Sequence, residues 1–264
     1  MIADRSGSRK RILLTGAAGG IGSAFFHAAA SAYLFRLADR ETTSLHLAGS
    51  SEHEVRAFDV ADLEACQRLC RDMDMVVHLA ATTNPEADFY QSLLHSNICG
   101  TYNIFRAAKD QGCQRVIFAS SAQVFAGYPD DVQAHPESPL RPMNMYGVSK
   151  CFGEAVAAYF AHAEGLSSIA VRIGSYDEGA DASNWLRQQP NARHLSGYVS
   201  ERDVNQLLVR CIEASDVSFA IVHAISNNRF KRLDLTSTRD LLGYAPQDDA
   251  FEIFQADLPA WLQQ

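Results

Sequence analysis

The sequence predicts an α/β fold in which a doubly wound parallel sheet carries helices on both faces and a small cap at its C-terminal end. Three observations predict it. Short apolar runs alternate with longer helical segments, a glycine cluster directly follows the first run, and 47% of the 264 residues are apolar. Such a chain can bury a sizeable core, and strands that alternate with helices form parallel βαβ units.

The first strand is expected at 11–15, and a helix over 21–32 follows the glycines. Further strands are expected at 33–38, 55–58, 75–79, 115–119 and 168–172, and further helices at 63–73, 90–111 and 146–164. The proline-rich stretch 127–144 predicts a loop that is long enough to be functional. We expect residues 1–175 to form a nucleotide-binding domain and 176–264 a small substrate-binding region packed on it, with two or three helices.

Composition excludes several classes of function. The formal charge is −8, and the longest cationic run covers only residues 9–11, so nucleic acid is not an expected partner. No apolar stretch reaches the ~18–20 residues of a membrane span, and the first ten residues lack the apolar core of a signal peptide. The six cysteines form no CxxC pair, which predicts reduced thiols, no metal site and a cytoplasmic protein.

Residues 15–22, TGAAGGIG, lie between the first strand and its helix. Glycines at this place let the backbone turn tightly and approach a pyrophosphate, and the helix N-terminus supplies free N–H groups. The spacing is GxxGxxG rather than GxGxxG. The segment predicts a dinucleotide site formed by Gly16, Gly19, Gly20, Ile21 and Gly22.

Asp39 follows Gly16 by 23 residues, at the end of the second strand. A carboxylate there can bind the adenosine ribose and repels a 2′-phosphate, so NAD is expected as the cofactor rather than NADP. Arg40 leaves NADP open, because a neighbouring guanidinium can bind that phosphate. Asp59 and Val60 end the third strand and are expected to flank the adenine.

Tyr146 and Lys150 open a helix and lie on one face of it, four residues apart. Free tyrosine has a pKa of about 10, so its use as a base near neutral pH needs a nearby positive charge such as an ammonium. Ser121 ends the fifth strand on the same rim of the sheet and can orient a substrate hydroxyl. Together the three residues predict proton abstraction coupled to hydride transfer.

The ordered set TGAAGGIG, HLAA at 78–81, Asn97, FASS at 118–121 and YGVSK at 146–150 resembles the extended short-chain dehydrogenase/reductases of the NAD-dependent epimerase/dehydratase superfamily. The resemblance implies a Rossmann fold, a triad of Ser121, Tyr146 and Lys150, and a role for Asn97 in stabilising the catalytic region. It also implies that the nucleotide is contacted by Leu79, Ala80, Ala81, Ile173 and Ser175.

A narrower resemblance is to uronate dehydrogenases, through RLAD at 36–39, NICGTYNIFRAA at 97–108, VRIGS at 171–175 and RHLSGYVSERD at 193–203. It implies NAD-dependent oxidation of the anomeric C1 hydroxyl of a uronic acid to a lactone. The implied substrate residues are Thr83, Ser121, Ala122, Gln123, Tyr146 and Arg193. That family carries Asn-His where Ala122 and Gln123 stand here, so a neutral aldose remains an open alternative.

Two other functions remain open. A nucleotide-sugar epimerase or dehydratase shares the triad but usually carries a larger C-terminal domain than the roughly 90 residues present after position 175. A non-catalytic NAD-binding protein often lacks the tyrosine or lysine. The resemblance also implies a homodimer or higher homo-oligomer formed through the helices near 90–110 and 146–162.

Overall fold

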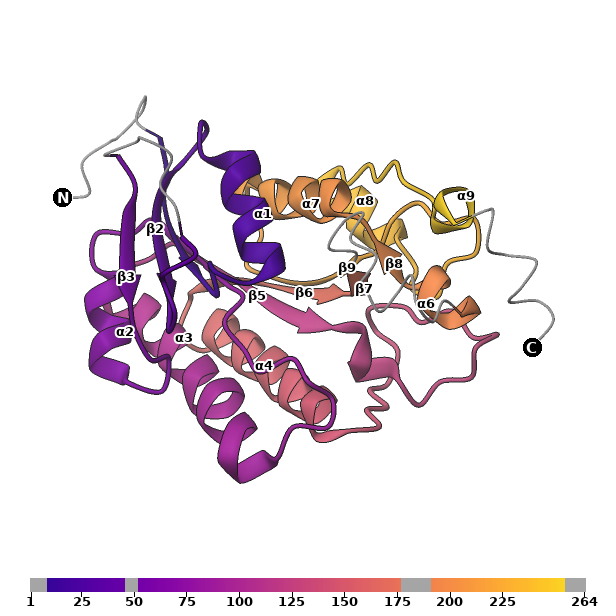
Figure 1. Ribbon diagram of the computed structural model, residues 1–264, viewed down its shortest axis with the longest axis horizontal. Coiled ribbons are helices and arrows are strands. Elements are labelled where there is room, and N and C mark those ends of the chain that lie inside the picture. The colour runs from indigo at the N-terminus through magenta and orange to yellow at the C-terminus, as the bar shows by residue number, and fades with distance from the viewer. Residues whose placement is uncertain (1–8, 46–51, 177–190, 255–264) are drawn as a thin grey trace.

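A computed structural model describes residues 9–45, 52–176 and 191–254 of the chain. Figure 1 shows a parallel sheet between two layers of helices. The sheet has seven strands in the order β3-β2-β1-β4-β5-β6-β9, and every neighbouring pair is parallel. The predicted Rossmann-type doubly wound fold is confirmed.

The strands of this sheet are β1 (Arg11–Thr15), β2 (Leu34–Asp39), β3 (Glu54–Ala57), β4 (Met75–His78), β5 (Arg115–Ser121), β6 (Ser167–Ile173) and β9 (Phe219–Ala224). The helices before residue 176 are α1 (Gly20–Ala29), α2 (Leu63–Cys70), η1 (Phe89–Cys99), α3 (Gly100–Asp110), the short 3₁₀ turn η2 (Ala122–Phe125) and α4 (Met145–His162). Beyond it lie β7 (Ser175–Tyr176), α6 (Ala192–Ser196), β8 (Tyr198–Val199), α7 (Glu201–Glu213), α8 (Thr236–Leu242) and α9 (Ala250–Ile253).

Each face of the sheet has its own apolar core. Along β1, Ile12 and Leu14 pack under α1 and α7, whereas Leu13 packs under α2, α3 and α4. In Figure 1, α1 and α7 lie side by side on one face and the other three helices cover the opposite face. Because both faces are buried, the strands are continuous apolar runs rather than alternating ones.

The helix expected over 90–111 is confirmed, but its first half is not α-helical. Residues Phe89–Cys99 form a π-helix with i→i+5 hydrogen bonds, and the α-helical geometry begins only at Gly100. A π-helix is wider per turn than an α-helix and is frequent at functional sites. This segment carries Asn97 and faces the cleft described below.

Residues after 176 contribute more than a cap. β9 pairs with β6 along its whole length, and α7 packs against α1, so both belong to the main sheet layers. The segments on either side of the expected boundary at residue 175 therefore contribute strands to the same sheet. Four helices occur in the described part of this region, more than the two or three expected, and α6 and α9 are single turns. None of the helices in the described ranges has the length and hydropathy needed to cross a membrane.

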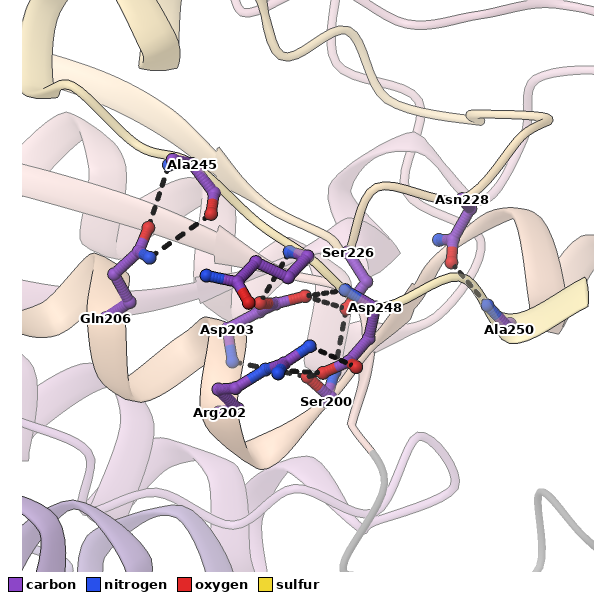
Figure 2. A network of polar contacts seen from close by, with 10 residues as sticks. Ser200, Arg202, Asp203, Gln206, Ser226, Asn228, Ala245, Asp248 and Ala250 are labelled. Atoms are coloured by element: carbon purple, nitrogen blue, oxygen red, sulfur yellow. Dashed lines mark hydrogen bonds and ion pairs between the residues drawn. The ribbon is translucent and has the colours of Figure 1, made fainter. Parts of the chain in front are cut away.

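A buried polar network joins the start of α7 to the segment after α8 (Figure 2). The Asp203 carboxylate accepts hydrogen bonds from the backbone N–H groups of Gln247 and Asp248, at 2.9 and 3.1 Å, and from the Ser226 hydroxyl at 2.6 Å. Ser200 caps α7 by accepting from the Asp203 N–H, and it donates to the Asp248 carboxylate. Much of the RHLSGYVSERD stretch therefore has a structural role.

Candidate active site

A cleft of about 1080 Å³ lies at the carboxyl ends of β1, β4 and β5, where the strand order reverses. This is the place at which doubly wound sheets bind nucleotides. The predicted nucleotide residues all line it: Gly16, Gly19, Gly20, Ile21, Gly22, Asp39, Asp59, Val60, Leu79, Ala80, Ala81, Tyr146, Lys150, Ile173 and Ser175. The predicted substrate residues Thr83, Ser121, Ala122 and Gln123 also line it, but Arg193 is not among the described lining residues.

Gly16, in the loop before α1, and Gly22, in the first turn of α1, have no room for a side chain. A Cβ on Gly16, which has a φ of +70°, would lie 2.6 Å from the Ala80 nitrogen. A Cβ on Gly22 would lie 2.2 Å from the Gly16 oxygen. The loop, β4 and α1 are therefore in backbone contact, and the first turn of α1 faces the cleft. This cradle fits the pyrophosphate of NAD.

Asp39 closes the nucleotide end of the cleft. One carboxylate oxygen accepts from the Ala18 N–H at 3.0 Å and the other from the Arg40 N–H at 2.7 Å. The charge is thus fixed beside the glycine loop, as the ribose contact requires. The Arg40 side chain also lines the cleft at this end.

The three predicted catalytic residues meet at the other end. Tyr146 and Ser121 both line the cleft, and the Ser121 hydroxyl lies close enough to Tyr146 to act on its pKa. The Lys150 ammonium lies 5.6 Å from the centroid of the Tyr146 ring and donates to the Ala119 carbonyl at 2.7 Å. All three side chains are nearly buried. Asn144 caps α4 by accepting from the Gly147 N–H at 2.7 Å, which fixes where Tyr146 enters the site.

Burial controls the charges of this group. Burial lowers the pKa of Lys150 to about 7. It also raises the pKa of Tyr146 above its ordinary value, and the nearby Ser121 hydroxyl opposes that rise in pKa. The protein side chains alone therefore do not lower the tyrosine pKa, and the expected lowering also depends on the positively charged nicotinamide ring. Desolvation outweighs the opposing effect of Ser121 on the Tyr146 pKa.

Asn97 lies behind the catalytic residues rather than in the cleft. Its side-chain amide donates to the Ser149 hydroxyl at 2.9 Å and to the Thr82 carbonyl at 3.0 Å, and its oxygen accepts from the Thr82 N–H at 2.8 Å. Ser149 in turn donates to the Tyr146 carbonyl. Asn97 thus links the π-helix, the loop after β4 and the first turn of α4.

Sequence reasoning missed a buried ion pair beneath this site. Glu154 on α4 pairs with Arg172 on β6 at 2.7 Å and accepts from the Ser120 hydroxyl at 2.5 Å. Arg172 also donates to the Pro136 carbonyl at 2.9 Å. The pair ties α4, β5 and β6 together next to Ser121. No local sequence signal marks it, because its members lie far apart along the chain.

The wall contributed by the π-helix was also missed. Gln91, Ser92, His95 and Ser96 line the cleft, as does His194 of α6. The pair of serines four residues apart, just before Asn97, is the signal that could have pointed to this wall. Ser92 donates to the Thr82 hydroxyl at 2.9 Å, which extends the polar chain from Asn97 toward the cleft.

Residues 12–181 match the profile of the NAD dependent epimerase/dehydratase family. A uronate dehydrogenase from Pseudomonas syringae pv. tomato is 32% identical over 251 residues, which are 95% of this chain and 86% of that protein. An NAD-dependent glucose-6-phosphate dehydrogenase from Haloferax volcanii is 36% identical over 255 residues, 91% of this chain and 94% of that protein.

Solved structures agree with the sequence comparison. The crystal structure of uronate dehydrogenase from Agrobacterium tumefaciens superposes with a TM-score of 0.83 at 32% identity, covering 96% of this chain and 89% of that one. A tyrosine-to-alanine mutant of the same enzyme, complexed with NAD, gives the same TM-score. Similarity therefore extends over nearly the whole chain and includes the region after the sheet.

Proposed function

Because this chain belongs to the NAD dependent epimerase/dehydratase family, we propose that it oxidises the anomeric C1 hydroxyl of a uronic acid or a related aldose to a lactone. The chain is an NAD-dependent oxidoreductase acting on CH–OH groups, and its relatives of similar length include dehydrogenases of sugars and sugar acids. The meeting of Ser121, Tyr146 and Lys150 in the lining of one cleft is the observation that carries the proposal.

Each residue of the triad has a separate task in this proposal. Ser121 orients the C1 hydroxyl, and Tyr146 takes its proton. Lys150 holds the nicotinamide ribose and adds positive charge beside the phenol. When bound, NAD supplies the hydride acceptor and a cationic ring that favours the phenolate. Thr83, Ala122 and Gln123 contact the sugar in this proposal, which their position in the cleft lining supports.

The test is NADH formation by the purified protein across a panel of free aldoses and uronic acids, with the lactone identified by mass spectrometry. At least one member should reduce NAD, and Tyr146→Phe should lower kcat by about 10²–10⁴-fold or more while the Kd for NADH changes little. UDP-sugars serve as the comparison. An enzyme that interconverts UDP-sugars without net NADH formation would overturn the proposal, as would a Tyr146→Phe variant within a few-fold of wild type.

A further inference from the structure

Arg193 is held outside the cleft by the loop after η2. One guanidinium nitrogen lies 3.2 Å from the Asp130 carboxylate, and the other donates to the Ala126 carbonyl. Both partners belong to the stretch 126–130, and neither is among the described residues that line the cleft. The arginine thus braces this loop.

The short helix that carries Arg193 presents a different side chain to the cleft. Consecutive residues of a helix point about 100° apart, so Arg193 and its neighbour His194 point in different directions. In α6 it is His194 that lines the cleft. Asn191 caps this turn by accepting from the His194 N–H at 2.9 Å, which sets the rotation of the helix. The register therefore places an imidazole, not a guanidinium, at the substrate end.

A second arginine fixes Asp130 in place. Arg232, which is only 8% exposed, lies 3.0 Å from the same carboxylate oxygen and donates to the Tyr128 and Pro129 carbonyls at 2.9 and 3.3 Å. An exposed ion pair alone is worth about 0–1 kcal/mol, because each side chain must be ordered to form it. Here Arg232 already orders the carboxylate, so the ion pair costs only the ordering of the Arg193 side chain.

We propose, on the premise of the function proposed above, that Asp130 is a specificity-determining residue that withholds Arg193 from the cleft and so selects a neutral aldose over the matching uronate. Among the described residues that line the cleft, arginine occurs only at position 40, at the nucleotide end. The polar groups near the catalytic end include Thr83, Gln123 and His194, which can bind sugar hydroxyls. Among these described residues near the catalytic end, a carboxylate would find no guanidinium for bidentate pairing.

The test compares sugars that differ only at C6: galactose with galacturonate, and glucose with glucuronate. Wild type should favour the neutral sugar at least tenfold in kcat/KM. Asp130→Asn should move the ratio toward the uronate at least tenfold, mainly through KM, because the released guanidinium reaches the carboxylate. Arg193→Ala added to Asp130→Asn should cancel the shift. Asp131→Asn is the matched control, since Asp131 is an exposed neighbour with the same charge, and the Arg193 ion pair is made with Asp130.

Two outcomes overturn the inference: a wild-type preference for the uronate, or an unchanged ratio in Asp130→Asn. Should Asp130→Asn fail to fold, as judged by its thermal melt, Asp130→Ser gives the same readout. Calorimetric titration of galacturonate into the NADH complex tests Asp130 separately from catalysis. Binding at least fivefold tighter in Asp130→Asn than in wild type supports the inference even if no sugar is oxidised, and equal binding overturns it.

Discussion

Asp39 bears on the choice between NAD and NADP at the scale of a single residue. Its carboxylate is fixed by the Ala18 N–H at 3.0 Å, so its charge faces the cleft at the nucleotide end. Asp39→Asn keeps an oxygen for that hydrogen bond and removes the charge. We expect the ratio of the Kd values of NADPH and NADH to fall at least about tenfold, or about 1.4 kcal/mol, in fluorescence titrations.

The matched variant for this prediction is Arg40→Ala, which should weaken the residual binding of NADPH and leave NADH nearly unaffected. A wild-type protein that binds NADPH tenfold more tightly than NADH would contradict the prediction. The 2′-phosphate would then be assigned to Arg40.

Lys150 carries a stability cost that depends on pH. Burial lowers its pKa from 10.5 to about 7, so between these values the unfolded chain binds more protons than the folded one. The folded state therefore gains stability as pH rises from about 7 to 10.5, and the cost of burying the charge is fully present below pH 7. Lys150→Met removes this cost together with the hydrogen bond to the Ala119 carbonyl.

We expect the wild-type protein to gain a few kcal/mol of unfolding free energy relative to Lys150→Met as pH rises through this window. Urea titrations of the nucleotide-free proteins at several pH values measure it. The pH dependence of this difference is the test, because the lost hydrogen bond changes the difference by the same amount at every pH. A difference that does not change with pH would mean that Lys150 stays fully protonated in the fold.

At the scale of an element, α7 is anchored by the carboxylate of Asp203. The side chain is fully buried and accepts from two backbone N–H groups and one hydroxyl. Asp203→Asn replaces one acceptor by an N–H group that faces other donors. We expect a loss of about 2–4 kcal/mol in the free energy of urea unfolding.

Arg202→Ala is the neighbouring control for Asp203, since the exposed Arg202 pairs only with Asp248 in the described network. Its loss should stay within about 1 kcal/mol. Equal losses in the two variants would mean that the network is not the anchor of α7.

The elements also show which parts of the fold local sequence patterns predict. The strands and α4 follow from apolar runs and from an asparagine cap, which are local signals. The π-helix over Phe89–Cys99 could not be predicted, because its i→i+5 bonds leave no pattern in the residue types. β9 was not predicted either, because its short apolar run lies in the region expected to be a cap, and its pairing with β6 depends on the tertiary fold.

At the scale of the whole molecule, the surface of α3 and α4 predicts self-association. Tyr102 is 45% exposed and Tyr159 is 53% exposed, and both helices lie on one face of the sheet (Figure 1). The family resemblance implies that two copies of the chain pair through these helices. Tyr102→Glu would bury a charge in such an interface, so its mass by light scattering should fall to that of the monomer.

The control for self-association is Leu241→Glu. Leu241 is 48% exposed but lies on α8, away from α3 and α4, so this variant should keep the wild-type mass. A wild-type protein that is already monomeric, or a Tyr102→Glu variant with an unchanged mass, would remove this face as the interface.

The sequence by itself determined the doubly wound sheet, the glycine cradle, Asp39 and the Tyr146–Lys150 pair, because each depends on the order of elements, periodicity or spacing along the chain. Only the tertiary structure decided the environment of these groups. It set the pKa of Lys150 through burial, placed Glu154 against Arg172, and turned Arg193 onto Asp130, 63 residues earlier in the chain. Desolvation and ion pairing depend on neighbours from distant segments, and no local pattern of residues records them.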